Sequence, residues 1–171
     1  MLTKFKDITT FIFDVDGVLT DGSVFVNDMG EQTRLFNIKD GYALQLAVKC
    51  GYNVCAISGS RSKIAIHRLN SLGIKDVFLG SGVKTETFKV YINERGISPM
   101  NVLYMGDDIP DLEVMQLAGL PCCPLDAVQE IKEISLYISH LKGGEGCGRD
   151  VIEKVMKLRG DWSNDTAVRS K

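Results

Sequence analysis

The chain alternates short apolar runs, typical of buried strands, with longer segments of helical periodicity. Runs such as TTFIFDV, NVCAISG and NVLYMG are separated by segments such as GYALQLAVKCG and KTETFKVYINERG. Parallel strands need a long crossover between them, and a helix supplies it. The alternation therefore predicts an α/β fold, a doubly wound, Rossmann-like parallel sheet with helices on both faces.

One domain accounts for most of the chain. With 171 residues, of which 44% are hydrophobic, the chain can bury a full core. We expect a single domain over residues 1–160. Residues 161–171 are polar, and we predict that they form a disordered tail.

One segment breaks the alternation. The stretch SVFVNDMGEQTRLFN carries two short alternating runs on either side of residues 27–30. This pattern predicts a β-hairpin inserted after the first strand, over about residues 22–37. Because a two-stranded hairpin is barely stable alone in water, this one needs a partner.

Charge and composition argue against several classes of function. The net charge is −2 and the lysines and arginines are scattered, so we expect no nucleic-acid partner. The residues MLTKFKDITT contain no continuous apolar segment of the kind a leader has, and no apolar run is long enough to span a bilayer. We therefore predict a cytoplasmic protein with no membrane partner.

The cysteines and histidines show no spacing typical of a metal site. With only His67 and His140, a histidine-based zinc site or a Ser-His-Asp triad is hard to build. The five cysteines are expected to be buried apolar side chains. They are Cys50, Cys55, Cys122, Cys123 and Cys147.

The end of the first predicted strand carries two aspartates, Asp14 and Asp16, in FIFDVDGVLT. Gly17 lets the chain turn sharply, so we expect Asp14 at the strand tip and Asp16 above it on the first loop residues. One carboxylate can then attack a substrate while the other moves a proton. A calcium loop or the acidic cluster of a receiver domain can carry the same pair.

Three later segments place polar residues at the same edge of the sheet. Ser58, after NVCAI, can hold a phosphoryl oxygen, although a lone serine there is more often a helix N-cap. Lys84 offers a fixed positive charge, although most lone lysines are solvated. In GDDIPD, the carboxylates of Asp107, Asp108 and Asp111 repel one another unless a cation relieves them, which predicts a magnesium site.

Taken in order, DVDGVLT, ISGS, an isolated lysine and GDDIPD resemble the haloacid dehalogenase (HAD) superfamily of phosphatases over essentially the whole domain. The resemblance implies that Asp14 is the nucleophile, which forms an aspartyl-phosphate, and that Asp16 is the general acid and base. Ser58 and Lys84 would bind the transferring phosphoryl group.

The resemblance also implies an Mg²⁺ cofactor, held by Asp14, the backbone carbonyl of Asp16, and Asp107. Asp108 and Asp111 would orient these ligands. No cap domain is expected, because one hairpin and one helix fill the interval between the first two motifs, and one helix and one strand fill the interval from Lys84 to Asp107. A capless phosphatase must shield its intermediate in another way, and a neighbouring subunit is the natural candidate.

A narrower resemblance rests on DVDGVLTDG, the hairpin, FNIKDGYAL, SRSKIAIHRLNSLGI and GGEGCGRD. These segments are similar to the 3-deoxy-D-manno-octulosonate 8-phosphate (KDO 8-phosphate) phosphatases, a capless, tetrameric family of lipopolysaccharide precursor synthesis. The similarity implies a sugar-acid phosphate as substrate. It also implies a homotetramer in which hairpins meet at the centre and a neighbouring subunit covers each active site.

The narrower resemblance also implies a set of substrate contacts, in which arginine and lysine suit a carboxylate and asparagine and aspartate suit hydroxyls. Ser60 stands where one common form of the family has arginine, and Arg61 follows it as a substitute. Arg68, on a predicted amphipathic helix, would also suit a surface ion pair. The implied contacts are Asn37, Ile38, Lys39, Asp40, Gly41, Gln45, Arg61, Arg68 and Arg149.

Three other functions compete with this interpretation. A phosphatase for a nonulosonate (sialic-acid-type) 9-phosphate shares the four motifs, although NIKDGYALQLA looks more like the octulosonate family. A phosphoaccepting receiver domain lacks a counterpart of Asp16 that would drive turnover. A noncatalytic oligomerisation module would not need every core position intact.

Overall fold

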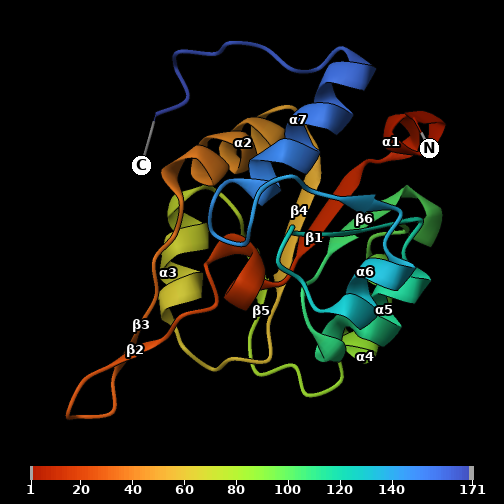
Figure 1. Cartoon of the computed structure of the whole chain (residues 1–171). Coiled ribbons are helices and arrows are strands. Elements are labelled where there is room, and N and C mark those ends of the chain that lie inside the picture. Colours follow the sequence, from red (N-terminus) through yellow and green to blue (C-terminus); the bar gives the residue numbers. More distant parts are fainter. Residues whose placement is uncertain (1, 170–171) are drawn as a thin grey trace.

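The computed structural model describes residues 2–169 and places six strands in one sheet, in the order β5-β4-β1-β6-β7-β8 (Figure 1). Every neighbouring pair of strands is parallel. This order confirms the predicted doubly wound sheet. The strands are β1 (Thr10–Phe13), β4 (Asn53–Ile57), β5 (Asp76–Phe78), β6 (Val102–Met105), β7 (Leu120–Cys123) and β8 (Tyr137–Ile138).

Helices cover both faces of the sheet, because successive strand side chains point to opposite sides. In β1, Phe11 and Phe13 pack into one apolar core, and Ile12 packs into the other. The first core includes residues of α1 (Leu2–Asp7), α2 (Ile38–Lys49), α3 (Ile64–Ser71) and α7 (Cys147–Arg159), and the second includes residues of α4 (Lys84–Glu94), α5 (Leu112–Leu117) and α6 (Gln129–Ile134).

Three short helices lie outside the sequence prediction, because a segment of one turn is too short for a helical period to show. They are α1 and two 3₁₀ helices, Pro99–Asn101 and Ile109–Asp111. The segment Val15–Leu19 forms a further tight helical turn, interrupted by a kink at Asp16 and Gly17.

The hairpin is present after β1, with strands of only two residues each, β2 (Phe25–Val26) and β3 (Gln32–Thr33). It projects away from the sheet (Figure 1). Its apolar side chains face solvent in the single chain, with Phe25 71% exposed and Met29 80% exposed. A ribbon of this kind has no core of its own.

Residues 161–169 lie beside α2. The Tyr42 hydroxyl accepts a hydrogen bond from the Asp165 N–H (3.1 Å), and the Tyr42 and Trp162 rings meet edge to face. Residues 170–171 fall outside the described part of the chain. Disorder of the whole tail in solution stays a prediction.

Two further expectations concern composition. Four of the five cysteines are buried, as expected, but Cys50 is exposed because it ends α2 at the surface. Among residues 2–169, every helix is too short or too polar to cross a membrane.

Candidate active site

The carboxyl end of β1 lies at the point where the order of strands reverses, between β4 and β6. In an open α/β sheet, such a switch point forms a crevice for ligands. Asp14 follows β1 directly and is 7% exposed. Its Oδ1 accepts a hydrogen bond from the Val15 N–H (2.7 Å), which orients the carboxylate at the strand tip.

The first loop, residues 14–20, passes very close to Asp107. Gly17 has a φ of +89°, in the left-handed region that favours glycine. A Cβ at Gly17 would lie 2.0 Å from Asp107 Oδ2, so any side chain there would push the carboxylate away. The glycine predicted to turn the chain therefore also makes room for the acidic cluster.

Lys84 contacts two carboxylates at once. It is the first residue of α4, and its Nζ lies 3.0 Å from Asp14 Oδ2 and 2.8 Å from Asp111 Oδ1. Asp111 Oδ1 also accepts a hydrogen bond from the buried Tyr104 hydroxyl (2.8 Å). Lys84 is therefore a buried cation within the cluster, and the alternative of a solvated surface lysine does not apply.

Ser58 follows β4 and is 1% exposed. Its Oγ accepts a hydrogen bond from the Ser60 N–H (3.1 Å), and α3 begins six residues later, at Ile64. Ser58 is therefore not the N-cap of α3. A hollow of about 310 Å³ brings together all the predicted catalytic and metal-site residues, Asp14, Asp16, Ser58, Lys84, Asp107, Asp108 and Asp111.

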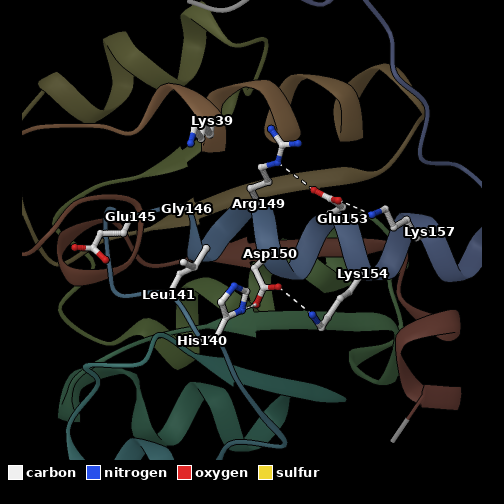
Figure 2. Close-up of a pocket in the computed structure, with 10 residues that line it drawn as sticks. All are labelled: Lys39, His140, Leu141, Glu145, Gly146, Arg149, Asp150, Glu153, Lys154 and Lys157. Carbon is white, nitrogen blue, oxygen red and sulfur yellow. Dashed lines mark hydrogen bonds and ion pairs between the residues drawn. The ribbon is translucent and has the colours of Figure 1, made fainter.

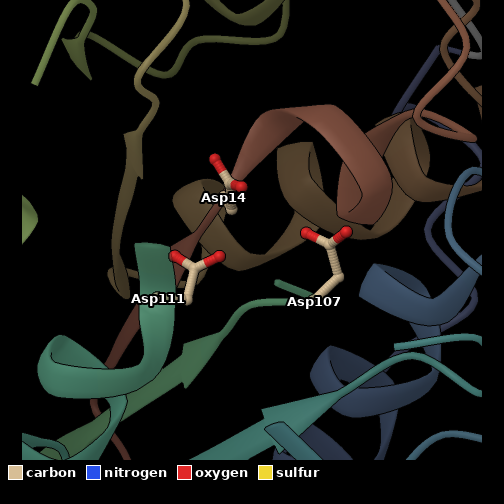
Figure 3. Close-up of side chains that lie close together, drawn as sticks. All are labelled: Asp14, Asp107 and Asp111. Carbon is tan, nitrogen blue, oxygen red and sulfur yellow. The ribbon is translucent and has the colours of Figure 1, made fainter. Parts of the chain in front are cut away.

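Three carboxylates converge beside the tip of β1 (Figure 3). One oxygen each from Asp14, Asp107 and Asp111 lies within 4.8 Å of the other two. Asp107 Oδ1 and Asp111 Oδ2 are buried and have no hydrogen-bond partner among the described residues. Unpartnered carboxylate oxygens at this spacing fit a hard divalent cation such as Mg²⁺. Asp108 lies apart and caps the following 3₁₀ helix through the Ile109 N–H (2.8 Å).

The crowding shifts the pKa values of these groups. Burial, reinforced by the charge of Asp111, raises the pKa of Asp14 well above its usual value and that of Asp107 to about 7. Burial alone would lower the pKa of Lys84, but attraction to Asp14 and Asp111 outweighs it and raises the pKa. The cluster therefore has more negative charge than Lys84 alone can offset, and a divalent cation would complete the balance.

Arg34 is a residue of the site that the sequence prediction missed. It directly follows β3, and its Nε lies 2.5 Å from Asp16 Oδ1. The sequence around it is misleading, because Arg34 is buried whereas the adjacent Leu35 is 77% exposed. No sequence pattern pointed to Arg34, because a buried arginine beside an exposed leucine reverses the usual preference of these residue types.

Comparison with known proteins finds relatives that match nearly the whole chain. Residues 60–146 match the model of the haloacid dehalogenase-like hydrolases. A KDO 8-phosphate phosphatase from Salmonella typhi is 34% identical over 160 residues, which cover 94% of this chain and 85% of that protein. This chain belongs to the haloacid dehalogenase-like hydrolases.

Two solved structures extend the comparison to this hydrolase's fold. The KDO 8-phosphate phosphatase from Yersinia pestis has a TM-score of 0.91 and 30% identity, covering 94% of this chain and 86% of its own. The enzyme from Moraxella catarrhalis, in complex with a magnesium ion, a phosphate ion and KDO, has a TM-score of 0.91 and 31% identity, covering 94% and 92%. The fold of residues 2–169, a six-stranded sheet with helices and no evident cap domain, therefore matches that of solved relatives.

Several of the predicted substrate contacts have structural partners in the single subunit of this hydrolase. Asn37 caps α2 through the Lys39 N–H (2.8 Å) and donates from Nδ2 to the Gly144 carbonyl (3.0 Å). Asp40, 2% exposed, accepts a hydrogen bond from the Arg149 N–H (2.6 Å) at the start of α7. Asn37 thus joins α2 to the loop before α7, and Asp40 joins α2 to α7 itself. Neither side chain lines the hollow around Asp14.

None of the remaining predicted contacts lines that hollow, and only Arg61 lines the groove next to it. Gln45 donates to the carbonyl oxygens of Gly41 (3.1 Å) and Arg169 (2.9 Å), and Arg68 lies against Gly41. Ile38 is 57% exposed. Arg61 lines a groove beside the hollow. A substrate role for the others would need a neighbouring subunit and stays a prediction.

Arg149 and Lys39 line a separate charged groove of about 590 Å³ along α7 (Figure 2). The Arg149 guanidinium lies over the rings of Tyr42 and Trp162, and its Nε pairs with Glu153 (3.0 Å). These contacts hold Arg149 between α2 and the C-terminal segment.

The glycine-rich loop of residues 143–146 packs against the back of the first loop. The Gly144 N–H donates to the Val18 carbonyl (3.0 Å), and the Cys147 thiol donates to the same oxygen (3.2 Å). A Cβ at Gly143 would lie 2.0 Å from the Gly17 carbonyl oxygen. The late GGEG motif thus supports the loop that carries Asp16.

We expect Gly143→Ala to lower the free energy of unfolding by about 1–3 kcal/mol, because the new methyl group overlaps backbone that cannot move aside. It should also lower phosphatase turnover, since the first loop would shift. Chemical denaturation and a phosphate-release assay measure both effects. Gly82→Ala is the matched control, because a Cβ there meets no atom within 4 Å. Equal stability of the two variants would contradict the support role.

Asp40 makes stability depend on pH. Burial, opposed by the Arg149 N–H, raises its pKa from 3.8 to about 6, so the folded state holds the proton more tightly than the unfolded chain. The stabilisation from protonation is complete below pH 3.8 and is lost as pH rises through 6. The loss approaches about 3 kcal/mol at neutral pH.

We therefore expect Asp40→Asn, which keeps an acceptor for the Arg149 N–H, to gain stability relative to the parent protein as pH rises from about 4 to 7. Urea denaturation of both proteins at several pH values measures the difference. Other carboxylates titrate in both proteins and largely cancel. A difference in unfolding free energy that does not change with pH would refute this account of Asp40.

Proposed function

We propose that this hydrolase is an Mg²⁺-dependent phosphatase that converts KDO 8-phosphate to KDO and phosphate through an aspartyl-phosphate. The observation that carries the chemistry is the buried Asp14 carboxylate, set between Lys84 and two further carboxylates at the switch point of the sheet. The names of relatives that match nearly the whole chain support the substrate.

Asp14 would attack the phosphorus in line, so that its oxygen bonds to phosphorus while the bond to the sugar oxygen breaks. Asp16 gives a proton to that leaving oxygen. Asp16 then takes a proton from the water that attacks the phosphorus of the aspartyl-phosphate. Inorganic phosphate leaves, and the Asp14 carboxylate is restored.

Lys84 and Ser58 would hold the phosphoryl oxygens during both steps. The Lys84 ammonium is already fixed by Asp14 and Asp111, so it needs little rearrangement when negative charge develops on the phosphoryl group. Ser58 lies across the hollow at the end of β4, where its hydroxyl can donate to the same group.

Asp14, Asp107 and the backbone carbonyl of Asp16 are the proposed Mg²⁺ ligands. The unpartnered oxygens of Asp107 and Asp111 fit such an ion. When bound, Mg²⁺ would offset the negative charge shared by the carboxylates and the phosphoryl group. Asp111, which is fixed by Lys84 and Tyr104, would hold the ligands in position.

The hairpin is proposed as the centre of a homotetramer in which a neighbouring subunit covers the active site. Five large apolar side chains in and beside the hairpin are exposed, and association would bury such side chains. They are Val24, Phe25, Val26, Met29 and Leu35. Covering would exclude water from the aspartyl-phosphate where no cap domain does so.

The proposed function is tested by phosphate release from KDO 8-phosphate, a nonulosonate 9-phosphate and glucose 6-phosphate, with Mg²⁺ and with chelator. We expect KDO 8-phosphate to give the highest kcat/KM and chelation to abolish turnover. Asp14→Asn should be folded and inactive, because it lacks the nucleophile.

Each contrary outcome has a distinct meaning. Higher kcat/KM on the nonulosonate phosphate would leave the chemistry standing and overturn the substrate. Full activity of Asp14→Asn would overturn the aspartyl-phosphate. Undiminished activity in chelator would overturn the metal requirement.

We expect the double variant Phe25→Asp/Met29→Asp to dissociate the tetramer, because each charge falls in the proposed apolar interface. Light scattering after size-exclusion chromatography measures the mass, and turnover should fall with it. Val90→Asp, at a position on α4 that is 55% exposed, is the control and should remain tetrameric. A hairpin variant that stays tetrameric, or a parent protein that is monomeric, would contradict the proposed tetramer.

A further inference from the structure

Arg34 is unusual for its position in the chain. It follows a hairpin whose own strand residues are exposed, yet only 4% of its side chain is exposed. A guanidinium is always charged, so its burial requires a fixed partner. That partner is Asp16, the proposed general acid and base.

The contact with Asp16 is made at two points. Arg34 Nε donates to Asp16 Oδ1 (2.5 Å), and Nη2 lies 3.3 Å from Oδ2. Two parallel contacts between planar groups fix the rotation of a carboxylate as well as its position. Asp16 has no other side-chain partner among the described residues, so Arg34 alone sets its orientation.

The same guanidinium ties three segments of the chain together. Its Nη2 also contacts Ser60 Oγ (3.1 Å), in the loop after β4, and Gln32 Oε1 (3.2 Å), in the hairpin. Asp16 and Ser60 line both the hollow around Asp14 and a neighbouring groove of about 650 Å³ beside the hairpin. The Arg34–Asp16 pair therefore lies between the hollow around Asp14 and the groove beside the hairpin.

We infer that Arg34 is a positioning residue for catalysis. It holds the Asp16 carboxylate at the hollow around Asp14 and links the orientation of that carboxylate to the hairpin. The inference rests on the proposed role of Asp16 in proton transfer. Without Arg34, Asp16 would keep its backbone position but rotate freely, and both the protonation of the leaving group and the activation of water would slow.

The test compares Arg34→Ala, Arg34→Lys and Lys89→Ala, all with Mg²⁺. On KDO 8-phosphate, Arg34→Ala should lose about 10- to 100-fold in kcat, part of what proton transfer contributes, with little change in KM. Arg34→Lys should recover only part, since an ammonium cannot make the two-point contact. Lys89→Ala, which removes an exposed cation from α4, should match the parent protein.

A second substrate separates positioning from a structural defect. The leaving group of 4-nitrophenyl phosphate departs without a proton, so only the later hydrolysis of the aspartyl-phosphate needs Asp16. Arg34→Ala should therefore release a rapid burst of one equivalent of 4-nitrophenol per site, followed by slow turnover. Added guanidinium should speed the slow phase, because it can occupy the vacated place beside Asp16.

Three results would overturn the inference. They are equal slowing of the burst and the steady state, a rise in KM for KDO 8-phosphate with kcat unchanged, and full activity of Arg34→Ala. Thermal unfolding and light scattering show whether each variant is folded and assembled, and Arg34→Lys carries the test if Arg34→Ala does not fold. If the parent protein releases no phosphate from either substrate, the proposed function fails instead.

Discussion

A single buried ammonium group, that of Lys84, joins the carboxylates of the candidate active site. Lys84 Nζ lies 3.0 Å from Asp14 and 2.8 Å from Asp111, and it joins the end of β1 to the loop after β6. Carboxylates this close would repel one another in a place from which water is largely excluded. Lys84 offsets part of that charge, and the part left over makes the site suitable for a divalent cation and a phosphoryl group.

The backbone around the carboxylate cluster is packed so closely that two positions have no room for a side chain. Glycine at position 17 lets the first loop pass Asp107, and glycine at position 143 lets the late loop press against the first loop from behind. Close backbone approach leaves no room for a Cβ, so the first loop is held between two surfaces. Asp16, the proposed proton-transfer residue, lies on this loop, and its carboxylate is paired with Arg34.

That the proposed catalytic residues meet in one hollow could be predicted from the sequence, because the order of motifs in an α/β fold maps onto the order of strands. Asp14, Ser58 and Asp107 come just after β1, β4 and β6, and Lys84 begins the helix that follows β5. Parallel strands bring their carboxyl ends to one edge of the sheet, where these residues line one hollow. The predicted substrate contacts are different. Asn37 and Asp40 use their polar atoms to cap and join helices, a role that spacing along the chain cannot distinguish from ligand binding.

The sequence by itself determined the fold class, the hairpin and the identity of the residues that meet at the end of β1, because hydrophobic period and strand-end chemistry are local properties. Only the tertiary structure decided that Arg34 is buried against Asp16 while Leu35 is exposed, and that the GGEG loop supports the first loop. Those contacts join residues that are distant in sequence, and their energies depend on which charges and backbone atoms the packed sheet brings together.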